Sequence, residues 1–119
     1  MSLLVEVFVR EPDGRMRILD VPDDVYQSGG FESWRTTVWG SPTVRSLGAR
    51  FLPLLAEDDL CVEPAQVSGL HDEVALLGAR LDDIARGTGS PRHQIGLRLR
   101  IIEESCRTAL EVKGGVLIW

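Results

Sequence analysis

The sequence of 119 residues predicts a single α+β domain, residues 1–119, with a mostly antiparallel sheet of three or four strands and helices on one face. Three observations predict this class. The N-terminal region alternates like a β-hairpin, the second half carries two helical apolar stripes joined by a short turn, and the C-terminal run is apolar throughout. Strands separated from consecutive helices are typical of α+β domains.

The N-terminal hairpin is expected to pair residues 4–10 with residues 15–21. β-branched and aromatic residues fill the first segment, and Glu11-Pro12-Asp13-Gly14 supplies the turn. Apolar and charged residues alternate in the second segment, so one of its faces meets a core and the other meets water. Such a hairpin needs helices to cover it.

The segment after the hairpin is expected to begin with a loop at residues 25–30, because Ser28-Gly29-Gly30 does not favour regular structure. Residues 31–38 then read as a short helix with three apolar residues on its inner face. These are Phe31, Trp34 and Val38.

A second short helix is predicted from Ser41-Pro42, with Ser41 at the N-cap and Pro42 at the first helical position. Pro53 ends its apolar stripe. Residues 60–62 are a predicted short strand, which Pro64 closes.

Residues 65–86 are predicted as one long amphipathic helix, because apolar residues recur there at steps of three and four. The turn at residues 87–91 ends this helix and begins another, which runs to Gly114. Two long helices joined by so short a turn are expected to pack antiparallel. Residues 116–119 are expected to be a buried strand, with Trp119 tied into the sheet.

The charge of the chain bears on its partners. Thirteen basic and 18 acidic residues give a formal net charge of −5, which disfavours nucleic acid and anionic membrane surfaces. A basic protein surface is a better electrostatic match, although modest acidity also serves solubility alone. The sequence has no run long and apolar enough to cross a bilayer and no export signal, so we expect a cytoplasmic protein.

The turn at residues 87–93 is the best candidate for a ligand site. Thr88, Ser90, Arg92 and His93 could hold a phosphate-containing small molecule beside the start of the second long helix. The spacing is not that of a P-loop. A glycine helix end followed by Ser90 as N-cap and Pro91 at the first helical position also accounts for the residues.

Catalytic and metal-binding patterns are weak. We expect Cys61 and Cys106 to be reduced, buried and unreactive, and His71 to face outward with Asp72 and Glu73. No metal-ligand spacing appears, so we assign no catalytic residue, metal or cofactor. Adjacent carboxylates are expected on solvated faces: Asp23-Asp24, Asp58-Asp59, Asp82-Asp83 and Glu103-Glu104.

A partner-binding surface is the other candidate. Two of the three tryptophans, Trp34 and Trp39, fall within six residues, and Arg35 lies between them. Aromatic and arginine side chains are typical interface anchors. We expect Trp34 in the core and Trp39 at an exposed edge. The partner-binding residues predicted from this pattern are Arg35, Trp39, Glu57, Asp58 and Asp59.

Four segments carry a resemblance to known proteins: Gly30-Phe31-Glu32-Ser33-Trp34-Arg35, Val38-Trp39-Gly40-Ser41, Leu47-Gly48-Ala49 and the C-terminal Gly115–Trp119. They resemble a group of small uncharacterised bacterial proteins, from which no activity transfers. In size, acidity and fold plan the chain is also similar to bacterial toxin-immunity proteins, which bind and cover a toxin. That second likeness rests on fold and charge alone.

These features favour a noncatalytic protein-binding module, immunity- or antitoxin-like, with an acidic surface for a basic partner. The alternative is a binder of a phosphate-containing small molecule, or an enzyme, centred on the turn at residues 87–93. A third reading is a homodimer that pairs through an exposed sheet edge or the outer face of the helix pair.

Overall fold

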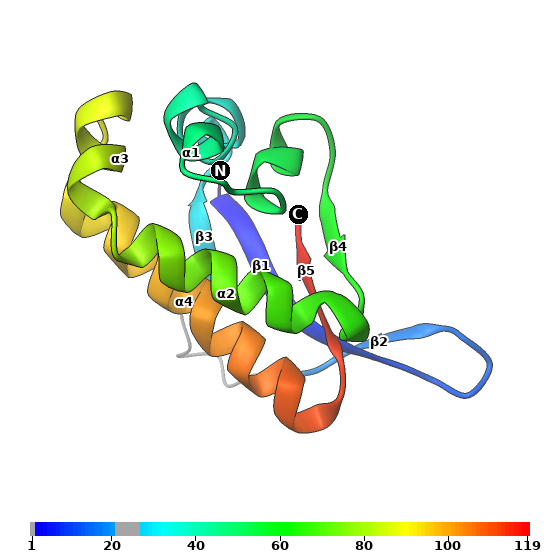
Figure 1. Ribbon diagram of the computed structural model, residues 1–119. Coiled ribbons are helices and arrows are strands. Elements are labelled where there is room, and N and C mark those ends of the chain that lie inside the picture. The colour runs from blue at the N-terminus through cyan, green and yellow to red at the C-terminus, as the bar shows by residue number, and fades with distance from the viewer. Residues whose placement is uncertain (1, 21–26) are drawn as a thin grey trace.

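The computed structural model describes residues 2–20 and 27–119, which form two layers (Figure 1). Within these residues the strands are β1 (Ser2–Arg10), β2 (Met16–Ile18), β3 (Ser28–Phe31), β4 (Leu60–Val62) and β5 (Gly115–Ile118). They form one antiparallel sheet in the order β2-β1-β5-β4, with β3 also paired to β1. Helices α2 (Val67–Gly78) and α4 (Arg92–Val112) cross one face as an antiparallel pair. The α+β class is confirmed, with five strands instead of three or four.

The hairpin forms as predicted and projects beyond the helical layer (Figure 1). Its turn is closed by the bond from Gly14 N to Glu11 O at 2.8 Å, and the positive φ of 88° at Gly14 suits glycine. β2 ends at Ile18. The predicted end of the second strand at Val21, the Asp23-Asp24 pair and the predicted start of the loop at Val25 lie outside the described residues.

β3 replaces the loop that we expected at residues 28–30. It pairs with β1 through Ser2 opposite Phe31 and Leu4 opposite Ser28. Its glycines let side chains approach the backbone: Gly30 has φ 121° and a Cβ there would lie 2.6 Å from the ring of Trp34, while a Cβ at Gly29 would lie 2.9 Å from Val5 Cγ2. The glycines that suggested a loop therefore allow close packing in an edge strand.

The helix predicted at residues 31–38 is also wrong. Phe31 belongs to β3 and is 51% exposed, so it does not share an inner face with Trp34 and Val38. A single π-helical turn, η1 (Arg35–Trp39), follows and is closed by the bond from Gly40 N to Arg35 O at 2.9 Å. This wider turn brings both Val38 and Trp39 into the core.

Two short elements follow η1. Helix α1 (Pro42–Ser46) has Ser41 at its N-cap, where the hydroxyl accepts from Val44 N at 3.2 Å, as predicted. The 3₁₀ helix η2 (Leu52–Ala56) has Pro53 in its first turn and leads towards β4.

The predicted helix at residues 65–86 is divided in the structure. A 3₁₀ turn, η3 (Pro64–Gln66), precedes α2, and a separate helix α3 (Leu81–Thr88) follows it. α2 ends where Ala79 N donates to Leu76 O and Arg80 N donates to Leu77 O. Arg80 has φ −125° and ψ 32°, which lie outside the helical region. The apolar stripe continues across the break, which is why periodicity alone did not reveal it.

The break directs α3 towards α1 (Figure 1). Gly87 of α3 lies so close to Thr43 of α1 that a Cβ at residue 87 would lie 2.1 Å from Thr43 Oγ1. The glycine is therefore required by the contact between these two helices.

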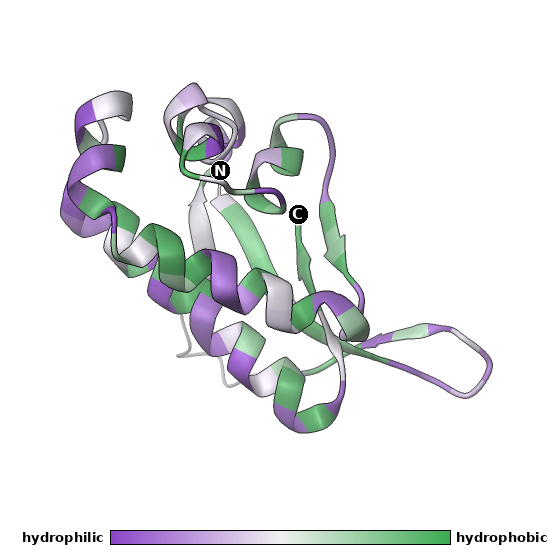
Figure 2. Ribbon diagram, in the orientation of Figure 1, coloured by the Kyte–Doolittle hydropathy of each residue, from purple (hydrophilic) through white to green (hydrophobic). Residues whose placement is uncertain are grey.

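The core lies between the sheet and the helices, where β1, β5 and β4 are hydrophobic, while the projecting end of the hairpin is more hydrophilic (Figure 2). Residues buried there include Leu3, Val5, Val7, Val62, Leu70, Leu77, Ile95, Ile102, Cys106 and Ile118. Within residues 2–20 and 27–119, no helix combines the length and apolarity that a membrane span requires.

Trp119 is not buried as expected, since its side chain is 49% exposed. Strand alternation places it on the opposite side of β5 from Ile118, which faces the core. Its backbone still pairs with Leu4 through both hydrogen bonds, and its indole N–H donates to Glu6 Oε1 at 2.9 Å. The chain end is therefore joined to β1, but by backbone pairing rather than by burial of the ring.

Candidate functional site

Glu57, Asp58 and Asp59 form an exposed acidic corner between η2 and β4. The corner begins where η2 closes, since Glu57 N and Asp58 N both donate to Leu54 O at 3.0 and 3.2 Å. Asp58 Oδ1 then accepts from Asp59 N at 2.7 Å. Local hydrogen bonds therefore fix the backbone conformation of these three consecutive acidic residues.

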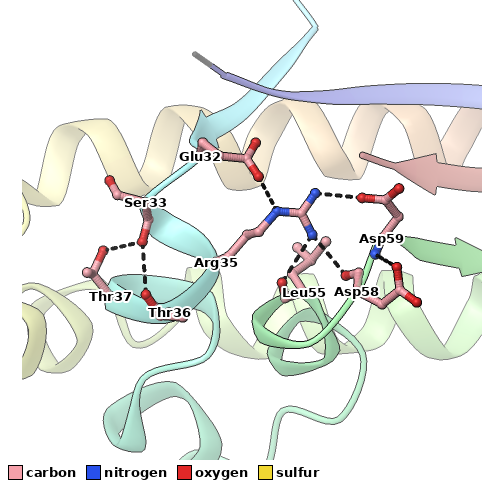
Figure 3. Close-up of polar contacts among 8 residues, drawn as sticks. All are labelled: Glu32, Ser33, Arg35, Thr36, Thr37, Leu55, Asp58 and Asp59. Atoms are coloured by element: carbon pink, nitrogen blue, oxygen red, sulfur yellow. Dashed lines mark hydrogen bonds and ion pairs between the residues drawn. The ribbon is translucent and has the colours of Figure 1, made fainter.

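Arg35 connects the acidic corner to η1 (Figure 3). Its Nη1 donates to Leu55 O at 3.1 Å and to Asp58 O at 2.9 Å, and its Nη2 donates to Asp59 Oδ1 at 2.6 Å. On the other side, its Nε donates to Glu32 Oε1. One guanidinium therefore fixes two backbone carbonyls and two carboxylates, which the planar arrangement of its donors allows.

Burial opposes the charge of Arg35, but hydrogen bonds to Asp59 and Glu32 outweigh it, so the pKa of Arg35 is raised above its ordinary value. The Arg35 side chain is only 18% exposed. Arg35 does lie next to Asp58 and Asp59, as the predicted site requires. Its guanidinium is directed at these residues more than at solvent. Arg35 therefore positions the corner. Sequence reasoning missed Glu32, although its spacing of three residues from Arg35 was a signal.

Trp39 is not at an exposed edge, and that prediction is corrected. Its side chain is 0% exposed, packs edge-on against Trp34 at a centroid distance of 5.6 Å, and donates from Nε1 to Gly29 O at 2.9 Å. The π turn of η1 rotates it inward, whereas an α-helix through Trp34 and Val38 would have placed it at the side. Trp39 therefore has no surface with which to contact a partner in this fold.

Two exposed apolar residues are close in sequence to the same carboxylates. Leu54 of η2 is 50% exposed and precedes the acidic corner by one helical turn. Phe31 is exposed and directly precedes Glu32. The segments that carry Glu32 and the acidic corner thus also carry two exposed apolar side chains.

The turn at residues 87–93 matches in part the arrangement of a glycine helix end followed by a new helix, which needs no ligand. Gly89 ends α3 with φ 75°, as a glycine helix end predicts, but the N-cap of α4 is Pro91 and not Ser90. Thr88 Oγ1 donates to Ile84 O at 2.7 Å and accepts from Ser90 N at 3.3 Å. Thr88 is therefore bonded within the turn.

Only two of the four predicted ligand residues line a pocket. Arg92 and His93 line a small pocket of about 130 Å³, and Thr88 and Ser90 do not. The pocket also includes Arg100 from the next turns of α4, which sequence reasoning missed. The spacing of His93 and Arg100, seven residues apart in one helix, was the available signal.

The two free cysteines differ from each other. Cys106 is buried as expected, and burial raises the pKa of its thiol to about 12. Cys61 is exposed, which corrects our expectation, because strand alternation turns it away from the core between Leu60 and Val62. Its sulfur is still partly shielded from water, and this shielding and the nearby Glu63 carboxylate raise the pKa of Cys61 as well. Both environments favour the thiol over the reactive thiolate.

Glu73 does not face outward as expected. It is buried, and its carboxylate accepts hydrogen bonds from Arg50 N, from Phe51 N at 2.9 Å and from Leu52 N at 2.9 Å. It lies three residues after Leu70 and four before Leu77, so its position on the apolar face of α2 was the missed signal. Its role is to hold the start of η2, which in turn leads to the acidic corner.

Across the described parts of the chain, no group of three or more His, Cys, Asp or Glu residues is arranged to hold a metal ion. Comparisons of the chain with protein-family models, with curated proteins and with solved structures found no match. The fold and site therefore define an α+β domain with a structurally fixed acidic corner.

Proposed function

We propose that this chain is a noncatalytic protein-binding module whose acidic corner meets a basic protein partner, in the manner of an immunity or antitoxin protein. The observation that carries the proposal is the fixation of Glu32, Asp58 and Asp59 around the single guanidinium of Arg35.

Charge supports the choice of partner. The chain has a formal net charge of −5, and the corner concentrates three adjacent carboxylates on an exposed turn. Arg35 balances only part of this charge, because Glu32 and Asp59 share it while Glu57 has no ion pair within the described residues. A basic partner surface would be steered to such a corner and oriented on it.

Preorganisation supports affinity. Binding costs less when interface groups are already ordered, and here two backbone carbonyls and two carboxylates are bonded to one side chain. Asp59 uses Oδ1 for Arg35, which leaves Oδ2 for a partner's arginine or lysine. The exposed side chain of Leu54 offers an apolar contact beside these charges.

The test is affinity capture from a lysate of the source organism with three versions of the chain. The corner variant carries Glu57→Gln, Asp58→Asn and Asp59→Asn, which keep side-chain size and remove three charges. The control variant carries Asp72→Asn, Glu104→Gln and Glu111→Gln, three exposed acidic residues elsewhere on the chain. Both variants change the net charge equally.

A basic protein bound in stoichiometric amount by the wild type and control, and at least about tenfold less by the corner variant, is the expected result. Equal capture by the wild type and corner variant would contradict the proposed site. Equal loss in both variants would mean that overall charge, and not the corner, attracts the partner.

A further inference from the structure

The face of the sheet opposite the helices carries apolar side chains. Helices α2 and α4 cover one face of the sheet (Figure 1), and strand residues such as Val5 and Ile118 point to the core beneath them. Strand alternation turns the residues in between to the other face. There Leu4 and Trp119 are exposed and Leu117 is half-buried. An apolar surface therefore lies outside the core.

Cross-strand pairing brings these residues together. Leu4 N donates to Trp119 O at 2.7 Å, and Trp119 N donates to Leu4 O at 3.0 Å. Leu117 lies opposite Glu6 in β1 and opposite Cys61 in β4. The indole N–H of Trp119 donates to Glu6 Oε1 at 2.9 Å, which ties the ring to this face. Leu4, Glu6, Cys61, Leu117 and Trp119 therefore form one continuous surface, the outer face.

The end of the outer face nearest the hairpin is closed. Phe8 pairs with Gly115, which alternation places on the same side as Leu117, and a Cβ at Gly115 would lie 2.3 Å from the Phe8 ring. The ring therefore lies over that glycine. Arg10 covers it, with its Cζ 5.2 Å from the ring centroid, and pairs with Glu63 at 2.6 Å. Phe8 is fully buried as a result, so the open apolar surface is at the other end.

The open end of the outer face is acidic. The last pair between β4 and β5 joins Leu60 to Ile118, so Asp59 and Trp119 are the next residues on these two antiparallel segments. Because β5 lies between β1 and β4, Trp119 has Glu6 on one side and Asp59 of the acidic corner on the other. Glu6 forms no ion pair with any residue that the structure describes. A cationic group is therefore favoured beside the indole.

We propose that the open end of the outer face binds an arginine side chain of the basic partner, stacked on the indole of Trp119 between Glu6 and Asp59. A guanidinium is planar and permanently charged, and it stacks on aromatic rings while its N–H groups reach carboxylates. Leu4 and Leu117 provide apolar contact for the residues beside that arginine. This inference rests on the proposed function and extends the partner surface from the acidic corner across the sheet.

The test adds acetylated and amidated tetra-arginine to the isotopically labelled full chain and follows chemical shifts by NMR. Tetralysine has the same charge without the planar group, and tetracitrulline has nearly the same shape without the charge. We expect millimolar tetra-arginine to give saturable shifts of the Trp119 indole N–H and of the Leu4, Glu6 and Leu117 amides. Tetralysine should bind more weakly, and tetracitrulline should give no saturable shift.

Variants test the indole and the carboxylate separately. Trp119→Leu keeps an apolar side chain and should weaken tetra-arginine by about threefold, the effect of one exposed cation–π contact. Phe31→Leu is the matched control, because that exposed ring lies beside Arg98 of α4 instead, and it should leave the affinity unchanged. Glu6→Gln should weaken tetra-arginine, whereas Glu104→Gln, an exposed site on α4, should not.

Three results would overturn the inference. The first is no saturable shift on the outer face at about 10 mM tetra-arginine, well above a millimolar Kd. The second is an equal loss of affinity in Trp119→Leu and Phe31→Leu. The third is a shift of the outer-face amides with protein concentration alone, which would assign this face to a second copy of the chain.

Failure of this inference and failure of the proposed function are distinguishable. Tetra-arginine shifts confined to the acidic corner would overturn stacking on Trp119 and leave the corner as the partner site. An outer face that binds tetra-arginine in a chain that captures no basic protein would support the arginine site and contradict the proposed function.

Discussion

Replacement of Glu73 by alanine is expected to lower the free energy of unfolding by about 3–5 kcal/mol. The Glu73 carboxylate is buried and accepts from the backbone N–H groups of Arg50, Phe51 and Leu52. Alanine would leave these donors without their acceptor at the start of η2, and it would also leave a cavity beside α2. Urea unfolding followed by circular dichroism measures the change.

Two further variants define the cause. Glu73→Gln keeps the shape and one acceptor oxygen, so we expect an intermediate loss of about 1–3 kcal/mol. Asp72→Ala, on the exposed side of the same helix, should change stability by less than about 0.5 kcal/mol. If Glu73→Ala behaved like Asp72→Ala, Glu73 would not hold the start of η2.

Replacement of Trp39 by alanine should cost about 3–5 kcal/mol, the range for removing a large buried aromatic side chain. The ring is fully buried against Trp34, and its N–H donates to Gly29 O in β3. The substitution removes both the packing and the bond that connects η1 with β3. Thermal and urea unfolding of the purified variant measure this loss.

Trp39→Phe separates the two contributions, since phenylalanine keeps much of the packing and leaves Gly29 O without its donor, for an expected loss of about 1–3 kcal/mol. Phe31→Ala is the control, because Phe31 is an exposed aromatic residue nearby, and we expect less than about 1 kcal/mol. A near-neutral Trp39→Ala with weakened partner binding would instead place Trp39 at an interface.

The parts of the fold that the sequence predicted correctly depend on local patterns. The turn at Gly14, the N-cap at Ser41, the strand β4 and the length of α4 follow from residue type and spacing within a few positions. Tertiary contacts decided the others. The break at residues 79–80 lets α3 reach Thr43. In β3, Gly30 leaves room for the ring of Trp34, and the Gly29 carbonyl accepts from Trp39.

The candidate site divides in the same way. Charge and composition identified Asp58, Asp59 and Arg35, which the structure brings together across 24 positions of sequence. They did not reveal that Arg35 faces inward to hold the corner, nor that Glu73 fixes the preceding turn. Both roles depend on backbone groups that come close only after folding, so residue type alone does not predict them.

The most direct test of the held acidic corner is the affinity of the captured basic partner for Arg35→Gln, measured by calorimetry beside the wild type. This substitution removes a positive charge and makes the chain more acidic, so charge attraction alone would leave binding equal or tighter. Preorganisation by Arg35 instead predicts binding weaker by about tenfold, with the fold retained by circular dichroism. Equal or tighter binding would contradict the account.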